Sequence, residues 1–385
     1  MDKVRFGIIG LGNQGTHYFK NLFCNGKIKN GYVSALCDIN EDKLKEISKT
    51  TTDSICFFTD YKKMIKSGLC DAVLIEVPHY LHPKIVIDCL NEKINVLCEK
   101  PAGVYALQVR EMNEAVLRSE ALFSVMFNQR TNCVYRKMRE IILQGGLGIL
   151  QRVNWIITDW YRPECYYKSG TWRATWAGEG GGVLINQCPH QLDLVQWIVG
   201  EMPESVRGFC KYGKWRDIEV EDEVTAFFEY KSGATGVFIT TTGETPGTNR
   251  LEISGTKGKL LCEHDKLFWY KNVEDSMNFS KNATQSFSCP DYQVSEVQTD
   301  GKNLQHEEII NNFADAILGK AELFVDGTEG IYGVELMNAI ELSGWRNGER
   351  VSLPIDDKEY FNELKKRCQS SRYRDKDMFN YGEEK

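Results

Sequence analysis

The sequence predicts a two-domain α/β protein. Residues 1–127 are expected to form a doubly wound parallel sheet, and residues 128–385 a second domain with a large, mostly antiparallel sheet. The chain has 385 residues, which is too long for one ordinary core and suggests two domains at about 150 residues each. Short apolar runs alternate with helical periods over about the first 125 residues. After Gln129, strand-like runs instead follow one another with turn residues between them.

The N-terminal part has the pattern of repeated strand–helix–strand units. Apolar runs of strand length recur between amphipathic stretches of about ten residues, which is typical of a parallel sheet. We expect strands at Arg5–Ile9, Tyr32–Cys37, Ala72–Glu76, Asn95–Glu99 and Leu122–Phe127. We expect helices at Gln14–Phe23, Glu41–Lys49, Pro83–Asn91 and Ala106–Ser119.

The C-terminal part has the pattern of an antiparallel sheet. Turn signals such as Lys231-Ser232-Gly233 separate successive strand-like runs. We expect strands at Val153–Tyr161, Glu223–Tyr230, Thr235–Thr242, Arg250–Ile253, Lys259–Glu263 and Lys266–Tyr270. The polar stretch Asn272–Gln305 predicts no clear element, and helices are expected at Glu307–Leu318 and Ile331–Ser343.

Composition excludes several classes of protein. The hydrophobic share of 42% and the charged share of 26% are those of a globular chain, and no apolar run is long enough to span a membrane. A net charge of -7 gives no global attraction for nucleic acid. The start of the chain lacks the pattern of a secretion signal, so we expect a cytoplasmic protein. The thirteen scattered cysteines contain no C-x-x-C pair, which favours free thiols and no structural metal.

The strongest motif is Gly10-Leu11-Gly12-Asn13-Gln14-Gly15, placed after the first strand and at the start of a helix. In a dinucleotide site the first glycine permits a tight turn and the second lets the backbone approach the pyrophosphate. The third lets the helix pack closely on the strand, and the helix N-terminus, here with Asn13 and Gln14, binds the phosphates.

Asp38 ends the second strand and is the expected ligand of the adenosine ribose, unless it only caps the following turn. A carboxylate there repels a 2′-phosphate, and Ile39 and Asn40 bring no guanidinium to neutralise one. The sequence therefore favours NAD over NADP.

Two further clusters follow strands of the same sheet. Val77–His82, with Pro78, His79 and His82, comes after one strand, and Glu99-Lys100-Pro101 comes after the next. Ligands bind at the carboxyl ends of strands in an open parallel sheet, so we expect these segments to line the cofactor site. A partly desolvated lysine beside the nicotinamide is suited to exchange a proton with a reacting hydroxyl.

Combined with a third segment, Gly180–Asp193 (GGGVLINQCPHQLD), these motifs resemble the Gfo/Idh/MocA oxidoreductase family, which includes glucose–fructose oxidoreductase and inositol dehydrogenase. The resemblance runs from Val4 to Pro354. It implies a Rossmann domain followed by an α/β domain with a large open sheet. One face of that sheet covers the nicotinamide, and the other commonly forms a homodimer or homotetramer interface.

By position, Lys100 matches the family's active-site lysine and His190 its catalytic histidine, while Gln129 resembles the segment beside the nicotinamide. The sequence departs from the family at Asn186, where an aspartate is usual; an amide can neither accept a proton nor balance an imidazolium as a carboxylate does. Asn186 is then expected to orient a substrate hydroxyl, leaving the proton to His190 or Lys100. Asp193 either pairs with His190 or has a packing role.

A loop dense in aromatic and cationic side chains lies between Val153–Tyr161 and Gly180–Gly182, and it includes Trp160 and Arg173. Aromatic faces stack on sugar rings and guanidinium groups donate hydrogen bonds to hydroxyls, so Trp160, Arg173, Asn186, His190 and Lys100 are the expected substrate ligands. An oligomer interface is the alternative, because it is rich in the same residue types.

These observations favour an NAD-dependent dehydrogenase acting on a secondary hydroxyl of a sugar, polyol or glycoside. The alternative is an NAD-dependent glycosidase that oxidises its substrate transiently, eliminates the aglycone and restores the hydride. A non-catalytic sensor of sugar or nicotinamide is the third possibility, although the retention of Lys100 and His190 weighs against it.

Overall fold

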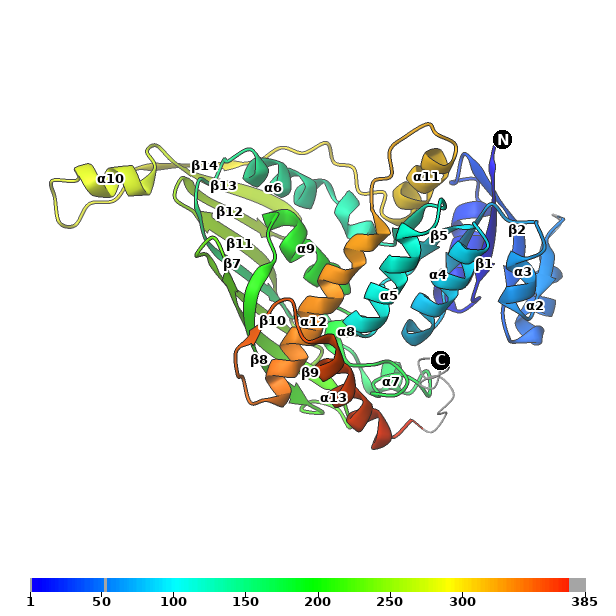
Figure 1. The fold of residues 1–385 in the computed structure, drawn as a ribbon. Coiled ribbons are helices and arrows are strands. Elements are labelled where there is room, and N and C mark those ends of the chain that lie inside the picture. The colour runs from blue at the N-terminus through cyan, green and yellow to red at the C-terminus, as the bar shows by residue number, and fades with distance from the viewer. Residues whose placement is uncertain (1, 52–53, 374–385) are drawn as a thin grey trace. The chain divides into compact units, whose positions relative to one another are not determined.

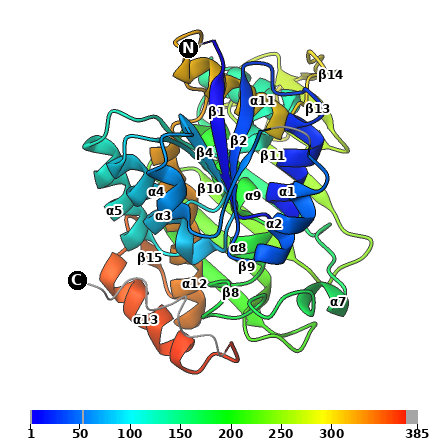
Figure 2. The same ribbon diagram turned by 90° about the vertical axis from the view of Figure 1, so that its right-hand side faces the viewer.

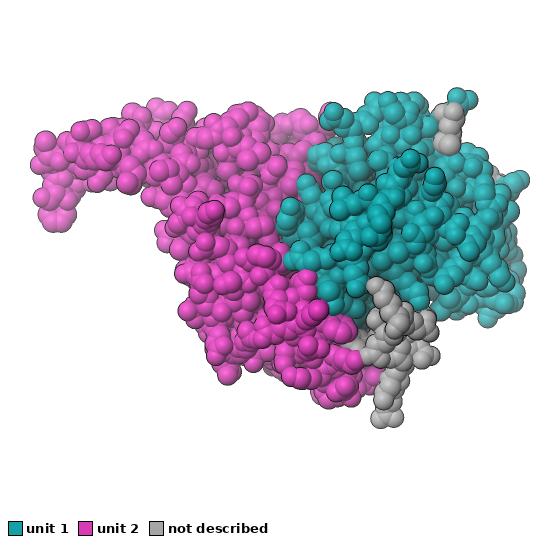
Figure 3. Space-filling model, viewed as in Figure 1, with its two compact units in different colours: residues 1–128, 304–334, 375–385 teal, residues 129–303, 335–374 magenta. Residues whose placement is uncertain are grey.

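The computed structural model describes residues 2–51 and 54–373 (Figures 1 and 2). The chain divides into two compact units (Figure 3). Among the described residues, unit 1 comprises residues 2–51, 54–128 and 304–334, and unit 2 comprises residues 129–303 and 335–373. Residues 304–334, which lie in the sequence between strands β14 (Tyr292–Glu296) and β15 (Val351–Ser352) of the second sheet, thus belong to the same unit as the N-terminal sheet.

Unit 1 is built on a six-stranded parallel sheet with the order β3-β2-β1-β4-β5-β6. Its strands are β1 (Val4–Ile9), β2 (Gly31–Cys37), β3 (Cys56–Phe58), β4 (Ala72–Ile75), β5 (Asn95–Cys98) and β6 (Phe123–Val125). The strand order reverses between β1 and β4, and in open parallel sheets ligands bind at such a point, outside the carboxyl ends of the strands. The prediction of a doubly wound parallel sheet is confirmed.

Helical segments of unit 1 alternate with its strands, and two more follow strand β14 of the second sheet. They are α1 (Asn13–His17), which continues into the π-helical η1 (Tyr18–Phe23), α2 (Glu41–Ser48), α3 (Tyr61–Ile65), the 3-10 turn η2 (His79–Leu81), α4 (His82–Asn91), α5 (Ala106–Leu117), α11 (His306–Ile317) and the 3-10 turn η4 (Gly327–Glu329). The side chain of Asn311 on α11 accepts a hydrogen bond from the Lys29 amide at 2.8 Å and donates one to the Lys27 carbonyl at 3.0 Å. These bonds anchor the returning chain segment to the N-terminal sheet.

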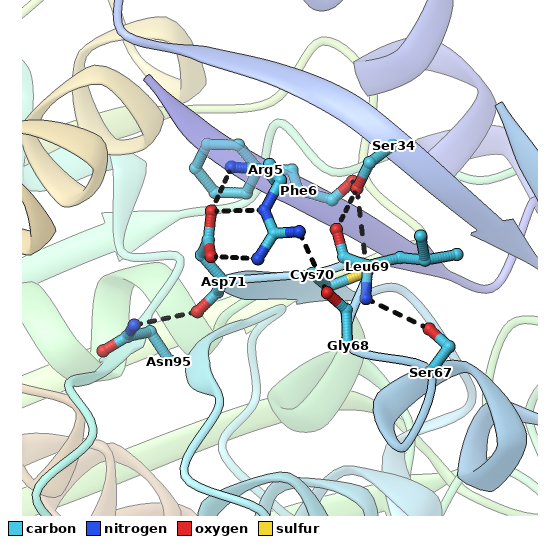
Figure 4. Close-up of polar contacts among 9 residues, drawn as sticks. All are labelled: Arg5, Phe6, Ser34, Ser67, Gly68, Leu69, Cys70, Asp71 and Asn95. Atoms are coloured by element: carbon cyan, nitrogen blue, oxygen red, sulfur yellow. Dashed lines mark hydrogen bonds and ion pairs between the residues drawn. The ribbon is translucent and has the colours of Figure 1, made fainter. Parts of the chain in front are cut away.

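The amino-terminal edge of this sheet is fixed by Arg5 and Asp71 (Figure 4). The Arg5 guanidinium donates to both oxygens of Asp71, at 2.8 and 3.1 Å, and the Arg5 amide donates to the same carboxylate at 2.8 Å. The side chain of Asn95 adds a bond to the Asp71 carbonyl at 2.8 Å. β1, β4 and β5 are therefore held in register at the edge opposite their carboxyl ends.

Unit 2 is built on a nine-stranded sheet with the order β14-β13-β12-β11-β7-β10-β9-β8-β15. Its strands are β7 (Leu150–Ile157), β8 (Pro203–Tyr212), β9 (Glu221–Tyr230), β10 (Thr235–Thr241), β11 (Asn249–Gly255), β12 (Gly258–Glu263), β13 (Lys266–Asn272), β14 (Tyr292–Glu296) and β15 (Val351–Ser352). β7 and β10 pair in parallel, and every other pair is antiparallel. The prediction of a large, mostly antiparallel sheet is confirmed.

Helices cover one face of the second sheet (Figure 1). Alternate residues of β9 (Val224, Ala226, Phe228 and Tyr230) are buried, which is the pattern of a strand with one covered face. The remaining helical segments are η3 (Asn128–Thr131), α6 (Cys133–Leu143), α7 (Glu164–Tyr167), α8 (Val183–Asn186), α9 (Pro189–Val199), α10 (Ser276–Asn282), α12 (Gly330–Trp345) and α13 (Asp357–Gln369). α10 and β14 lie in the polar stretch for which the sequence predicts no clear element.

No helix in the described part of the chain is long and apolar enough to cross a membrane. Within residues 2–51 and 54–373, no group of three metal-ligating side chains is arranged to hold a metal ion.

Candidate functional site

The glycine motif forms a tight turn between β1 and α1. Gly10 has a φ of +95°, and a Cβ at this position would lie 2.3 Å from the carbonyl oxygen of Glu76. A Cβ at Gly15 would lie 2.0 Å from the Gly10 carbonyl oxygen, so both positions require glycine. A Cβ at Gly12 would meet no atom within 4 Å, because this residue faces open space. A dinucleotide pyrophosphate can therefore approach the backbone at Gly12, beside the N-terminus of the helix that Asn13 and Gln14 begin.

Asp38 connects the end of β2 to the same turn. Its Oδ2 accepts a hydrogen bond from the Leu11 amide at 2.7 Å, and its Oδ1 accepts one from the Asn40 amide at 2.8 Å. Its side chain is only 8% exposed. Lone pairs remain on both oxygens for ribose hydroxyls, so the residue fits the predicted ribose ligand.

The structure adds a cation that the sequence argument did not consider. The Nζ of Lys43, on the first turn of α2, lies 3.7 Å from Asp38 Oδ2. The prediction of NAD over NADP considered only Ile39 and Asn40, whereas Lys43 places a positive charge beside Asp38.

His82 joins the loops that follow β4 and β5. Its Nδ1 lies 2.7 Å from the Pro101 carbonyl and its Nε2 lies 2.8 Å from the Val77 carbonyl. Burial lowers the pKa of this fully buried imidazole, while the two carbonyls raise it. His82 therefore holds the two predicted cofactor segments together, and the His79 ring lies 5.9 Å from the His82 ring at the turn after Pro78.

Glu99 and Lys100 follow β5, as the sequence predicts, and two further residues join them. The Tyr18 hydroxyl donates a hydrogen bond to Glu99 Oε1, and the Lys100 amide donates to Glu99 Oε2 at 3.0 Å. Burial raises the pKa of Glu99, and burial together with the nearby Glu99 charge raises the pKa of Glu76 well above its usual range. The positive charge of Lys100 opposes both shifts. The two buried carboxyl groups thus favour their protonated forms more than an exposed carboxyl group does, next to Lys100.

In unit 2, Asn186 ends α8 and His190 lies in the first turn of α9, after a bend at Cys188. The start of α8 is fixed by Glu221, whose carboxylate accepts hydrogen bonds from the amides of Gly182 at 2.9 Å and Leu184 at 3.0 Å. This contact accounts for part of the glycine run, because a Cβ at Gly182 would lie 2.0 Å from the Glu221 carbonyl oxygen.

The side chain of Asn186 lies in a network with the aromatic loop. Its Oδ1 accepts hydrogen bonds from the Tyr166 hydroxyl at 2.9 Å and from Gln187 Nε2 at 2.8 Å, and its Nδ2 donates to Glu179. The Arg173 guanidinium donates to the Tyr166 hydroxyl at 2.9 Å. Two of the predicted substrate ligands, Asn186 and Arg173, are thus brought together.

Arg173 also lines a cavity of about 290 Å³ in unit 2, whose walls include Tyr167, Arg216 and Arg372. Trp160 does not line this cavity. Its indole ring lies 5.5 Å from the Arg162 guanidinium, and its Nε1 is buried without a hydrogen-bond partner among the described residues.

Two other residues considered in the sequence lie nearer the start of unit 2. Gln129 is in η3, where its carbonyl accepts a hydrogen bond from the Asn132 amide at 3.1 Å. Asp193 forms a bidentate ion pair with Arg130 at 2.5 and 2.7 Å, and both side chains are almost fully buried. Asp193 is therefore held in the interior of unit 2 by Arg130.

Sequence reasoning missed Tyr18, Glu76 and Glu179. Tyr18 lies one helical turn after Gly15, and Glu179 directly precedes the three glycines. A charged residue at the end of the buried strand β4 was the available signal for Glu76, because charged groups are seldom buried without a role. Glu179 gave no comparable signal.

Comparisons with known proteins identify the family of the chain. Residues 4–127 match the family model "Oxidoreductase family, NAD-binding Rossmann fold", and residues 135–261 match the model "GFO/IDH/MocA C-terminal domain". Trans-1,2-dihydrobenzene-1,2-diol dehydrogenase of Bos taurus is 32% identical over 257 residues, covering 66% of this chain and 72% of that protein. Myo-inositol 2-dehydrogenase of Thermotoga maritima is 27% identical over 268 residues, covering 68% and 75% respectively.

Among solved structures, the WlbA dehydrogenase of Bordetella pertussis in complex with NADH and UDP-GlcNAcA is 25% identical. It superposes with a TM-score of 0.75 over 92% of this chain and 100% of that one. The chain is thus an oxidoreductase with a Rossmann nucleotide-binding domain. It belongs to the GFO/IDH/MocA family, as its motifs suggested, and its Rossmann domain is of the NAD-binding kind.

Proposed function

We propose that the protein transfers a hydride between a secondary hydroxyl of a sugar, polyol or glycoside and NAD. The observation that carries the proposal is the position of Lys100, directly after β5 and beside Glu99, which Tyr18 ties to the helix after the glycine turn. An ionisable amine is thereby placed at the carboxyl edge of the sheet, where a dinucleotide binds. The relatives named for myo-inositol and for a cyclic diol support a substrate with a ring-borne hydroxyl.

In the proposed reaction, Lys100 in its neutral amine form accepts the hydroxyl proton at Nζ and becomes the ammonium, and the His190 imidazole shares that proton or orients the hydroxyl. Asn186 and Arg173 position the substrate through their amide and guanidinium groups, and Trp160 provides an aromatic surface. Bound NAD supplies the hydride acceptor, so that the carbon loses a hydride and the oxygen a proton as the carbonyl forms. Gly10, Gly12, Asn13, Gln14, Gly15, Asp38, Pro78, His79, His82, Glu99 and Gln129 are the proposed cofactor contacts.

The first experiment is to incubate the protein with NAD and a panel of inositols, cyclic diols, monosaccharides, nucleotide sugars and aryl glycosides. NADH is followed by absorbance, and released aglycone is assayed in the same samples. NADH formation with an intact carbon skeleton supports the proposal. Aglycone release without net NADH contradicts it and identifies the glycosidase reaction instead.

Lys100→Met tests the assigned proton acceptor. Turnover is expected to fall at least about 100-fold, since general acid–base catalysis typically contributes factors of this size. NADH binding, measured by fluorescence, is expected to change little. Lys63→Met is the matched control, because Lys63 is exposed on α3. If Lys100→Met retains normal turnover, the proposed reacting centre is wrong.

A further inference from the structure

Glu179 is a buried carboxylate that the catalytic proposal does not use. Its side chain is 2% exposed, in the segment just before α8. Oε2 accepts a hydrogen bond from the Ala174 amide at 2.6 Å, Oε1 accepts one from Asn186 Nδ2, and Oε1 lies 3.8 Å from the Arg173 guanidinium. A buried carboxylate is stable only with such partners, so these contacts compensate its charge.

These contacts also fix the orientation of the Asn186 amide. Because a carboxylate only accepts hydrogen bonds, the Asn186 Nδ2 must face Glu179, and Oδ1 must face the donors Tyr166 and Gln187. Arg173 stacks 4.6 Å from the Tyr166 ring and donates to its hydroxyl. A continuous donor-to-acceptor chain therefore runs from Arg173 through Tyr166 and Asn186 to Glu179.

The chain contains one positive and one negative charge. Burial and the Glu179 charge raise the pKa of Tyr166, while Arg173 lowers it, so the phenol remains a donor. A carboxylate at position 186 would face Glu179 at hydrogen-bond distance with no proton between them. Like charges in such a buried position repel, and one of the two must then bind a proton.

We propose that Glu179 is a positioning residue of the reacting centre, and that this centre accommodates one carboxylate, at position 179, paired with one amide, at position 186. Glu179 holds the Asn186 carbonyl toward Tyr166 and keeps Arg173 at the wall of the cavity. The inference rests on the proposed function, because it explains how two proposed substrate ligands are held. It also gives a physical reason for the asparagine: the negative charge expected at position 186 is located at position 179.

Exchanging the two groups tests the proposal. The isosteric variants are Asn186→Asp, Glu179→Gln and the double variant N186D/E179Q. In the double variant the new amide at position 179 donates to the new carboxylate at position 186. That carboxylate still accepts from Tyr166 and Gln187, so the hydrogen bonds between the two positions and the aromatic loop are re-formed.

Each single variant is expected to lose at least about tenfold in kcat/KM for the substrate. Glu179→Gln loses a buried charge-assisted hydrogen bond, and Asn186→Asp places two carboxylates against each other. The double variant is expected to recover to within about threefold of the wild type, because the pairing is restored. The KM for NAD is expected to stay constant in all three variants, whereas the substrate KM rises in the single variants.

Glu140→Gln is the matched control, because Glu140 lies on α6 outside this cavity, is 48% exposed and pairs with Lys137 at 2.8 Å. Its kcat/KM is expected to match that of the wild type. A normal kcat/KM in Asn186→Asp overturns the proposal. So does a double variant whose loss in kcat/KM equals or exceeds the product of the losses in the two single variants.

Thermal unfolding separates this proposal from the proposed function. Asn186→Asp is expected to lower Tm by several degrees and the double variant to restore it, whether or not a substrate has been found. If the double variant has a restored Tm but the wild type reduces NAD with no substrate, the proposed function is refuted and the pairing of Glu179 with Asn186 is retained. A restored Tm without recovery of kcat/KM in an active enzyme refutes the positioning role.

Discussion

The Tyr18 hydroxyl donates a hydrogen bond to Glu99, linking the helix after the glycine turn to the segment that carries Lys100. Tyr18 is fully buried, and its pKa is raised by burial and then by the charges of Glu99 and Glu76. The two sides of the proposed cofactor site, separated by 81 residues in the sequence, are thereby connected by one hydrogen bond. The helix after the glycine turn is consequently tied to the segment that carries the proposed proton acceptor, Lys100.

Tyr18→Phe removes this connection. The free energy of unfolding is expected to fall by about 1–3 kcal/mol, because a buried carboxylate loses a donor. The KM for NAD is expected to rise several-fold, because the helix after the glycine turn loses its anchor to Glu99. Urea denaturation and initial-rate kinetics measure the two effects. Tyr61→Phe is the control, since Tyr61 donates to Asp88 at 2.6 Å between α3 and α4 and should change stability without changing the KM for NAD. Equal KM values for the two variants would contradict the assignment.

Asp38→Ala is expected to weaken NAD binding about tenfold, equivalent to about 1.4 kcal/mol. It is also expected to improve NADP binding, because the repulsion of a 2′-phosphate is lost and Lys43 is left to attract it. Fluorescence titration with NADH and NADPH measures both affinities. The double variant Asp38→Ala/Lys43→Ala should lose the gain for NADPH while remaining weak for NADH. Unchanged affinities in Asp38→Ala would show that Asp38 is not the ribose ligand.

The first sheet and its glycine turn could be predicted because their signals are local. Gly10 and Gly15 are required by backbone contacts within one strand–turn–helix unit, and that unit has a recognisable spacing. Short elements with weak patterns were missed, such as β3 (Cys56–Phe58) and α3 (Tyr61–Ile65). The place of α11 in unit 1 was also missed, because its bonds to Lys27 and Lys29 join residues more than 280 positions apart.

Only part of the candidate site in unit 2 could be predicted, for a similar reason. Asn186 and Arg173 were identified individually by motif and by residue type. The contact between Asn186 and Glu179 depends on the path of the loop, which has no periodicity to interpret. The departure from aspartate at position 186 was visible in the sequence, but its compensation by Glu179 required the fold.

Asp71→Asn tests the register of β1, β4 and β5 at the edge of the sheet opposite the proposed cofactor site. Burial alone would raise the pKa of Asp71, but the hydrogen bonds from Arg5 outweigh burial and lower it. A carboxyl group with a lowered folded pKa stabilises the protein above its unfolded pKa of about 3.9, and this contribution is lost as the pH falls through the folded pKa. Because Arg5 is 39% exposed, screening limits the expected loss in Asp71→Asn to about 1 kcal/mol at pH 7.

Urea denaturation at pH 7 and pH 3 measures this difference, which should shrink at the lower pH. The KM for NAD should remain normal, because the substitution is remote from the carboxyl ends of the strands. A difference in stability that grows toward pH 3 would contradict the interpretation.

Glu221 gives the opposite dependence on pH. Burial raises its pKa to about 7, although the amides of Leu184 and Gly182 favour the charged form. The nearby Glu341 is also buried, and it accepts a hydrogen bond from Tyr360. Because the folded pKa of Glu221 exceeds the unfolded value of about 4.3, the native state binds more protons between these two pH values. The contribution of Glu221 to stability should therefore decrease from about pH 4.3 to pH 7, by on the order of 3 kcal/mol, and level off above pH 7.

Glu221→Gln cannot titrate at this position. Urea denaturation at pH 5, 6, 7 and 8 measures the unfolding free energy of the wild type and of Glu221→Gln. As the pH rises to 7, the unfolding free energy of the wild type is expected to fall steadily relative to that of the variant. Parallel pH profiles for the two proteins would show that Glu221 is already charged at pH 5. In that case the N-terminus of α8 is held by a permanent carboxylate, and the position of Asn186 is independent of pH over this range.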